Sequence, residues 1–149
     1  MAFGQLSLKG RALKLLAARE HSRQELERKL APHEPEPGAL KRALDELQAR
    51  GFLDEQRVVE SLLHRRAGRL GAGRVRQELQ ARGVDPARVA AAVADLKATE
   101  VERAREVWRK KFGQPPADAA ERARQMRFLA TRGFSGEVLR QILATAGED

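Results

Sequence analysis

The sequence predicts an all-α protein built from three tandem three-helix repeats of helix-turn-helix type, about nine helices in an elongated chain. Two observations predict the repeat: Gly83 and Gly133 stand in similar strings 50 residues apart, and Arg-Gln-Glu-Leu occurs at 23–26 and again at 76–79. A third observation predicts the helical class, because no segment shows the sustained alternation of apolar and polar residues that strands show.

The two glycine strings predict one kind of joint between helices. Gly83 and Gly133 suit the end of a helix, because glycine adopts a positive φ without a Cβ clash. Two residues later, Asp85 and Ser135 are typical N-caps, and Pro86 suits the first position of a helix. The apolar residue between glycine and cap is expected to pin the turn into the core.

The first predicted repeat covers residues 1–53. Its first helix is expected from Ser7 to Arg19. Ser22–Glu25 fits a capping box that starts the second helix, and the proline-rich segment 31–38 must end that helix. The third helix stops at Gly51. Its buried stripe is predicted to be Leu40, Leu44 and Leu47.

The second predicted repeat covers residues 54–98. Asp54 is expected to cap the fourth helix. That helix is predicted to end at Gly68, Gly71 and Gly73, which are expected to leave a loose connection. The fifth helix is predicted from Arg74 to Arg82, and the sixth begins at Pro86.

The third predicted repeat covers residues 99–149. Thr99–Glu102 fits a second capping box for the seventh helix, although a helix continuous through this point is the alternative. Gly113–Pro116 stops that helix, Asp118 is expected to cap the eighth, and Ser135 the ninth.

Composition favours an anionic partner. The net charge is +8 and the isoelectric point is about 10.7, so nucleic acid or an acidic protein surface would be attracted. A solvated basic surface without a partner is the other reading of the charge alone. The chain has no cysteine, no visible secretory signal and no apolar run long enough to span a membrane. We therefore expect a cytoplasmic monomer.

The residues of catalytic chemistry are sparse. His21, His33 and His64 are not spaced to bind a metal from one helix face, and all three are expected at the surface. The acidic residues stand at helical distances from arginines, which predicts pairing on solvated faces. No glycine-rich phosphate loop or nucleophile elbow is present. The sequence therefore predicts a binding protein with no cofactor and no metal, and not an enzyme.

A sequence-specific DNA reader is disfavoured, although the glycine joints resemble a helix-turn-helix. Such a reader presents base-contacting side chains early in the helix after the turn. After Gly83 only Arg88 could serve, and after Gly133 the residue Glu137 would repel phosphate. Non-specific binding to the nucleic-acid backbone stays open, because it needs only cations.

Candidate partner-binding cations cluster on the second unit and the start of the third. Their role is a hypothesis, since any one of them could equally be part of a solvated helix face. The set comprises Arg65, Arg66, Arg69, Arg74, Arg76, Arg103, Arg109, Lys110, Lys111, Arg124, Arg127 and Arg132.

Several short strings stand along the chain in a recognisable order. They are Arg19-Glu-His-Ser22 with Glu25-Leu26 and Lys29-Leu30, Gly51-Phe-Leu-Asp54, Arg74-Val-Arg-Gln-Glu-Leu79 with Gly83, and Arg127-Phe-Leu with Arg132-Gly-Phe-Ser135. No single string is specific, but the ordered set resembles the bacterial RecX family across nearly the whole chain. One departure is at 54–59, where the family usually has two Asp and then an aromatic with Ala.

The resemblance implies three tandem three-helix units, in agreement with the repeat, and a modulator of the RecA recombinase. Proteins of this family bind the RecA filament on single-stranded DNA, inhibit its ATP hydrolysis, strand exchange and coprotease activity, and limit filament growth. The implied partner is thus the RecA filament, with single-stranded DNA a second candidate, in DNA repair, recombination and the SOS response. The alternative is a basic nucleic-acid-binding protein that acts without recombinase.

Overall fold

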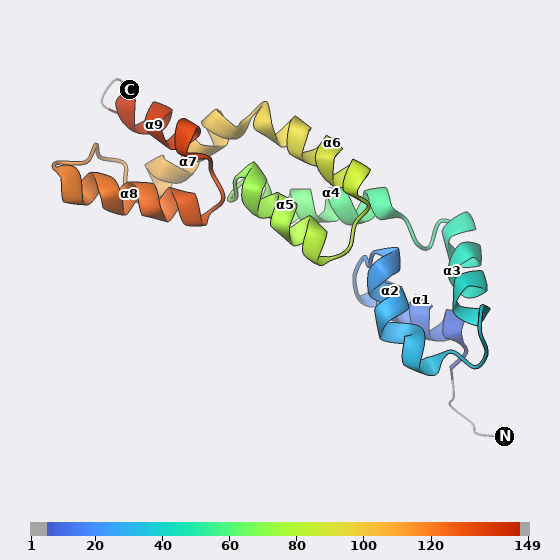
Figure 1. Cartoon of the computed structure of the whole chain (residues 1–149). Helices are drawn as coiled ribbons and strands as arrows, with labels where there is room; N and C mark the ends of the chain where they lie inside the picture. Colours follow the sequence, from blue (N-terminus) through green and yellow to red (C-terminus); the bar gives the residue numbers. More distant parts are fainter. Residues whose placement is uncertain (1–5, 147–149) are drawn as a thin grey trace.

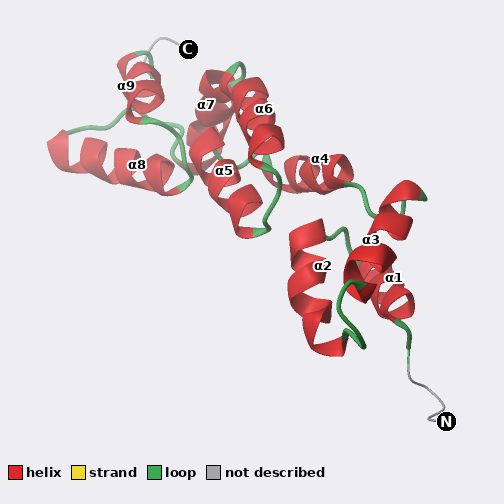
Figure 2. Cartoon of the chain, turned by 45° about the vertical axis from the view of Figure 1, so that its right-hand side comes forward, coloured by secondary structure: helices red, strands yellow, loops and turns green. Residues whose placement is uncertain are grey.

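The computed structural model describes residues 6–146, and that range contains nine α-helices, one short 3-10 helix and no strand (Figures 1 and 2). The all-α class is therefore confirmed. The helices form three groups that follow one another along a bent, elongated body, with the N-terminal group at one end and the C-terminal group at the other (Figure 1).

The first group contains α1 (Leu8–Ala18), α2 (Arg23–Leu30), the 3-10 helix η1 (Ala31–His33) and α3 (Ala39–Ala49). The predicted capping box at the start of α2 is confirmed, because side chain and backbone of residues 22 and 25 bond reciprocally. The core of this group consists of Ala12, Leu26, Leu30, Leu40, Leu44, Leu47 and Leu53.

The second group contains α4 (Glu55–Arg66), α5 (Ala72–Ala81) and α6 (Pro86–Lys97). Asp54 caps α4 as predicted, accepting from two backbone N–H groups. The core draws on all three helices and the loops between them. It consists of Val58, Val59, Leu62, Leu70, Ala72, Val75, Leu79, Val84, Val89, Ala92, Val93 and Leu96.

The third group contains α7 (Glu100–Lys111), α8 (Ala119–Thr131) and α9 (Gly136–Ala144). Asp118 and Ser135 cap α8 and α9 as predicted. The core residues are Ala104, Trp108, Leu129, Phe134, Leu139, Ile142 and Leu143. Each group thus has a hydrophobic core of its own, and we propose 1–53, 54–98 and 99–149 as the limits of the three repeats.

The glycine turns have the predicted conformation. Gly83 has φ +72° and Gly133 has φ +92°, in the left-handed region that favours glycine. The apolar residues that follow, Val84 and Phe134, are 4% and 3% exposed and pin the two turns into their cores.

The connection between α4 and α5 is not loose, and the prediction for this segment was wrong. α5 begins two residues earlier than expected, at Ala72, so Gly73 lies inside the helix and Gly71 precedes it in extended backbone. A Cβ on Gly71 would stand 2.4 Å from backbone atoms of Gly133. Glycine at this position allows two backbone segments to approach closely. From the sequence alone, the same glycine was interpreted as a sign of flexibility.

Two predicted caps do not form. Asp85 precedes α6, but its side chain makes no cap hydrogen bond, so Pro86 alone marks that start. Thr99 precedes α7 without a side-chain cap. Its backbone, with φ −115° and ψ 9°, is not in the extended conformation that an N-cap adopts, and its hydroxyl instead donates to the Leu96 carbonyl and accepts from Arg103.

His21, which was expected at the surface, is buried, and so are two acidic residues, Glu25 and Glu100. His21 is 2% exposed, with Nδ1 2.9 Å from the Arg19 carbonyl oxygen and Nε2 3.2 Å from Lys29 Nζ. Glu25 and Glu100 are 8% and 5% exposed, and neither belongs to a solvated helix face. All three lie where one helix group meets the next or at a capped helix start, which the helical periodicity of one element cannot show.

Candidate functional site

The first joint between repeats brings the start of α2 onto the turn between α5 and α6. The Ser22 hydroxyl donates to the Arg82 carbonyl. The backbone N–H of Arg23 donates to Glu55 Oε1 at 2.8 Å. The free donors of a helix start are thereby satisfied by the next repeat.

The second joint repeats this arrangement one unit later. The backbone N–H of Gly71, before α5, donates to the Arg132 carbonyl at 2.7 Å, on the turn between α8 and α9. The N–H of Ala72 donates to Glu100 Oε1 at 3.2 Å. Equivalent helix starts, turns and glutamates therefore hold each repeat to the next in the same way, and they fix where the exposed side chains of the three repeats lie.

Arg103 belongs to the second joint rather than to the open surface. Its guanidinium donates to the carbonyls of Ala67 and Leu96, both at 2.8 Å, and to that of Leu70. Burial lowers the pKa of Arg103 below its ordinary value. The side chain ties the end of α4, the end of α6 and the start of α7 together, which leaves it no donor fork for a partner.

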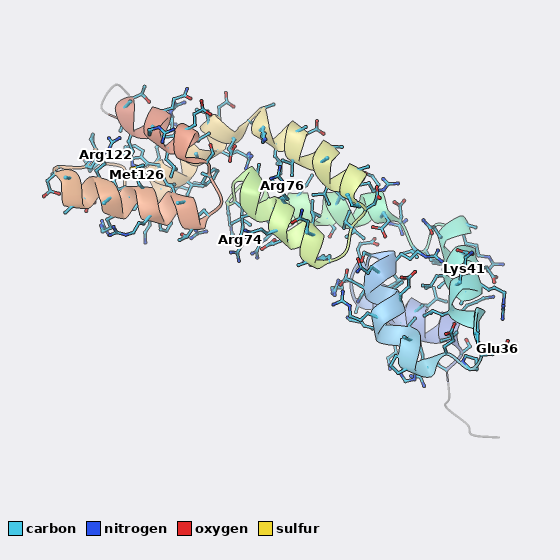
Figure 3. All side chains as sticks on the ribbon, viewed as in Figure 1. Glu36, Lys41, Arg74, Arg76, Arg122 and Met126 are labelled. Atoms are coloured by element: carbon cyan, nitrogen blue, oxygen red, sulfur yellow. The ribbon has the colours of Figure 1, made fainter. Side chains whose placement is uncertain are left out.

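The remaining candidate cations of the second repeat lie on α4, on α5 and on the turn between them, and are here called the α4–α5 patch. Glu78 lies between two of them, 2.7 Å from Arg66 and 3.8 Å from Arg74. Arg65, Arg69 and Arg76 are exposed and pair with no acidic residue of the described range. Figure 3 labels two of the five, Arg74 and Arg76, along α5.

The candidate cations of α7 are partly neutralised. Arg109 lies 3.9 Å and Lys110 3.7 Å from carboxylate oxygens of Glu106. Lys111, the last residue of α7, forms no ion pair within residues 6–146 and lies instead over the ring of Phe128, 5.2 Å from its centroid.

The candidate cations of α8 divide in the same way. The Arg124 guanidinium donates two hydrogen bonds, of 2.8 and 3.0 Å, to the Glu121 carboxylate, and this contact lowers the pKa of the Glu121 carboxyl. Arg127 is exposed and has no acidic partner in the part of the chain that the structure describes. Arg132 follows α8 and lies 4.9 Å from the Phe128 centroid.

Sequence reasoning missed the aromatic pair at the centre of these cations. The rings of Phe112 and Phe128 meet edge to face, with centroids 5.4 Å apart and planes at 85°. Both residues are only partly buried, against the edge of the third core. A signal was available, because Arg124, Phe128 and Arg132 follow one another at four-residue intervals on one face of α8.

Neither a metal site nor a membrane-spanning helix is found among the residues that the structure describes. Among residues 6–146 no group of three or more histidine, cysteine or acidic side chains is placed to hold a metal ion. None of the helices described has the length and apolar character needed to cross a membrane. The exposed cations and the partly buried ring pair are groups that can bind phosphate, carboxylate or nucleobases.

Comparison with known proteins decides the family. Models of the first, second and third three-helix domains of RecX match residues 9–47, 54–93 and 98–143. The chain belongs to the RecX family. Regulatory protein RecX of Leptothrix cholodnii is 60% identical over 145 residues, covering 97% of this chain and 92% of the relative. Regulatory protein RecX of Herbaspirillum seropedicae is 50% identical over 144 residues, covering 97% and 94%.

Solved RecX structures share the fold. The crystal structure of RecX from Lactobacillus salivarius superposes with a TM-score of 0.79 at 17% identity, covering 95% of this chain and 96% of that chain. A second crystal structure of regulatory protein RecX gives 0.72 at 20% identity, covering 91% and 70%. As a member of a family of regulatory proteins, the chain is a regulator and not an enzyme.

Proposed function

We propose that the protein regulates the RecA recombinase in the cytoplasm, and through it DNA repair, recombination and the SOS response. It binds the RecA filament on single-stranded DNA and suppresses ATP hydrolysis, strand exchange and coprotease activity. The observation that carries this proposal is membership of the RecX family across all three domains, with relatives named as regulatory proteins.

The architecture suits a filament as partner. Three small cores joined in a row give a long body that can lie along a groove and touch more than one protomer. Contacts that are individually modest add up in one chain, because each bound repeat raises the effective concentration of the next. A body bound across protomers in one arrangement disfavours the movements that hydrolysis and strand exchange require.

The cations without an acidic partner are the best candidates for contact, because binding does not first have to break an ion pair. Among the described residues of the proposed set these are Arg65, Arg69, Arg76, Lys111, Arg127 and Arg132. The paired residues Arg66, Arg74, Arg109, Lys110 and Arg124 are a second rank, since a stronger anion must displace Glu78, Glu106 or Glu121.

We propose a monomer, because the ends of the chain do not repeat the joint. At the first repeat, α1 begins with Leu8 where Glu55 and Glu100 begin α4 and α7. At the third, the N-cap of α8 is Asp118, whose charge would repel the carbonyl that Ser22 meets in the first joint. Light scattering after gel filtration measures this directly, and a mass that rises with concentration would contradict it.

Filament binding tests the proposal. Biotinylated single-stranded DNA on beads, bare or coated with the cognate RecA and a slowly hydrolysed ATP analogue, is mixed with the protein. We expect several-fold more protein on coated than on bare DNA. Replacing Arg65, Arg69 and Arg76 together by Ala should lower retention on the coated beads. The matched control replaces Lys14, Arg28 and Arg50, which are equally exposed on the first repeat.

The alternative function is nucleic-acid binding without recombinase, which the unpaired cations and the ring pair favour. It predicts equal or greater retention on bare DNA and a steep fall of affinity with salt. If coated beads retain no more protein than bare beads, the proposed regulatory function is contradicted and this alternative is favoured.

A further inference from the structure

The ring pair of Phe112 and Phe128 is unlike the other buried aromatics of its repeat. Trp108 and Phe134 are each 3% exposed and belong to the core. Phe112 and Phe128 pack against the edge of that core and are only partly buried. The third core therefore covers only part of each ring. The uncovered part lies at the surface, between the end of α7 and the middle of α8.

Cations cover these rings. Lys111 Nζ is 5.2 Å and the Arg132 guanidinium 4.9 Å from the Phe128 centroid, and the Arg124 guanidinium is 5.2 Å from the Phe112 centroid. At these separations each cation is attracted by the electron-rich face of the ring. Phe112, Phe128, Lys111, Arg124, Arg127 and Arg132 are here called the aromatic–cation cluster.

A hollow of about 660 Å³ opens beside Phe112, between the end of α7, the loop before α8 and the first turns of α8. Lys111, Arg124 and Arg127 line it together with the ring. Its two acidic residues are already engaged, because Asp118 caps α8 and Glu121 bonds Arg124 and Gln125. Three cations and two carboxylates line the hollow, so its net charge is positive, and the Phe112 ring is part of its wall.

We propose that the aromatic–cation cluster binds single-stranded nucleic acid, with a nucleobase stacked on Phe112 or on the guanidinium plane of Arg124 and flanking phosphates on Lys111, Arg127 and Arg132. Sequence-tolerant binding to single strands combines these two elements, a positive surface that follows the backbone and an aromatic side chain beneath a base. The inference rests on the proposed function for its setting, since a filament on single-stranded DNA supplies such a strand.

Single strands fit the cluster better than the other anions. A duplex keeps its base faces stacked, so it could use the cations but not the ring. A carboxylate of a protein partner would likewise pair with the cations and leave the ring idle. Only an unstacked base with phosphates on either side uses both features.

The first test uses the unmodified protein without recombinase. Fluorescence anisotropy compares a labelled oligothymidine with an abasic oligonucleotide of equal length, which has the phosphates but no bases. We expect at least about fivefold tighter binding to oligothymidine, from one stacked base. Equal affinities would overturn the inference. Oligouridine of the same length shows whether the class is DNA alone or single strands in general.

Variants then locate the stacked base. Phe112→Leu removes the ring and the support that it gives to the Arg124 guanidinium above it. It should therefore weaken oligothymidine binding about fivefold or more and leave abasic binding unchanged, whereas Arg127→Ala should weaken both. Phe52→Leu is the matched control, because Phe52 is 48% exposed on the first repeat. An equal loss in that control, or no loss in Phe112→Leu, would contradict the site.

Failure of this inference and of the proposed function are distinguishable. Fluorescence of Trp108, the one tryptophan of the chain, reports whether each variant is folded. If a leucine variant does not fold, the comparison of oligothymidine with abasic strand on the unmodified protein still decides. The anisotropy assay contains no recombinase, so a failure to bind the strand there would contradict the strand-binding site and not the proposed function. A failure to bind the coated beads would contradict the proposed function and not the strand-binding site.

Discussion

At the scale of single residues, the protein uses glycine in two different ways. Gly51 ends α3 with φ +81° and nothing stands within 4 Å of a Cβ placed on it. Gly133 has a similar φ, but its Cβ would meet the backbone nitrogen of Arg74 at 2.4 Å. The sequence shows both as helix stops, and only the structure shows that the second also lets two repeats touch.

Gly133→Ala should therefore destabilise the protein more than Gly51→Ala. Both substitutions place a Cβ in left-handed backbone, at a cost of about 1–2 kcal/mol. Only the first also forces two backbones apart, so we expect its loss of unfolding free energy in urea to exceed that of the control by at least about 1 kcal/mol. Equal losses would mean that the close approach at the second joint is unimportant.

The buried histidine makes stability depend on pH. Burial lowers the pKa of His21 below its ordinary value of 6.5 and outweighs the hydrogen bond to the Arg19 carbonyl, which raises it; the charges of Arg19 and Lys29 lower the pKa further and that of Glu25 raises it. The unfolded chain then binds the proton more readily than the folded one. The free energy of unfolding should thus fall as pH drops below about 6.5.

Urea unfolding at pH 7 and at about pH 5 measures this effect. His21→Asn removes the titrating ring, so its unfolding free energy should change less between the two pH values. A variant that keeps the full pH dependence of the wild type would show that the loss has another source.

At the scale of elements, the sequence predicted how helices start and stop far better than how repeats meet. Caps such as Ser22 and Asp118 and turns such as Gly83 depend on a few neighbouring residues, so local chemistry reveals them. The joints depend on residues far apart in the chain. Glu55 and Glu100 look like ordinary first-turn acids, yet each accepts a hydrogen bond from a helix of the preceding repeat.

The candidate site shows the same division. Net charge and clustering located the basic surface, but they could not separate Arg103, which holds a joint, from Arg127, which is free of acidic partners within the described chain. The apolar pattern also could not show that Phe112 and Phe128 are only partly buried. Helical spacing predicts the direction in which a side chain points, but not how completely other residues cover it.

Arg103→Met should loosen the second joint without unfolding the third core. The substitution removes the donors to three carbonyls and retains much of the apolar stem, so we expect a loss of about 2–4 kcal/mol. Small-angle X-ray scattering should show a broader distribution of distances than in the wild type. The exposed Arg122→Met is the control, and an unchanged scattering profile for the first variant would contradict its role (Figure 3).

At the scale of the whole molecule, two equivalent joints hold the three repeats in a fixed arrangement. The outer sides of the first and third repeats carry different residues and do not form a further joint of this kind. The result is a long basic body, and all three repeats carry exposed cations. This shape would let a protein of 149 residues contact several units of the proposed filament at once.

Charge should then govern the strength of association. We expect affinity for the coated filament to fall as salt is raised, because cations of the α4–α5 patch and of the aromatic–cation cluster meet anions there. The triple variant at Arg65, Arg69 and Arg76 should show a shallower salt dependence than the control triple variant of the first repeat. Identical slopes would remove the α4–α5 patch from the interface.

The most direct test of the regulatory role is the rate of ATP hydrolysis by the cognate RecA on single-stranded DNA, followed while this protein is titrated in. A body that spans protomers should slow hydrolysis at amounts well below one molecule per RecA. A rate that stays constant up to equimolar protein, under conditions where the protein is bound to the filament, would contradict the account.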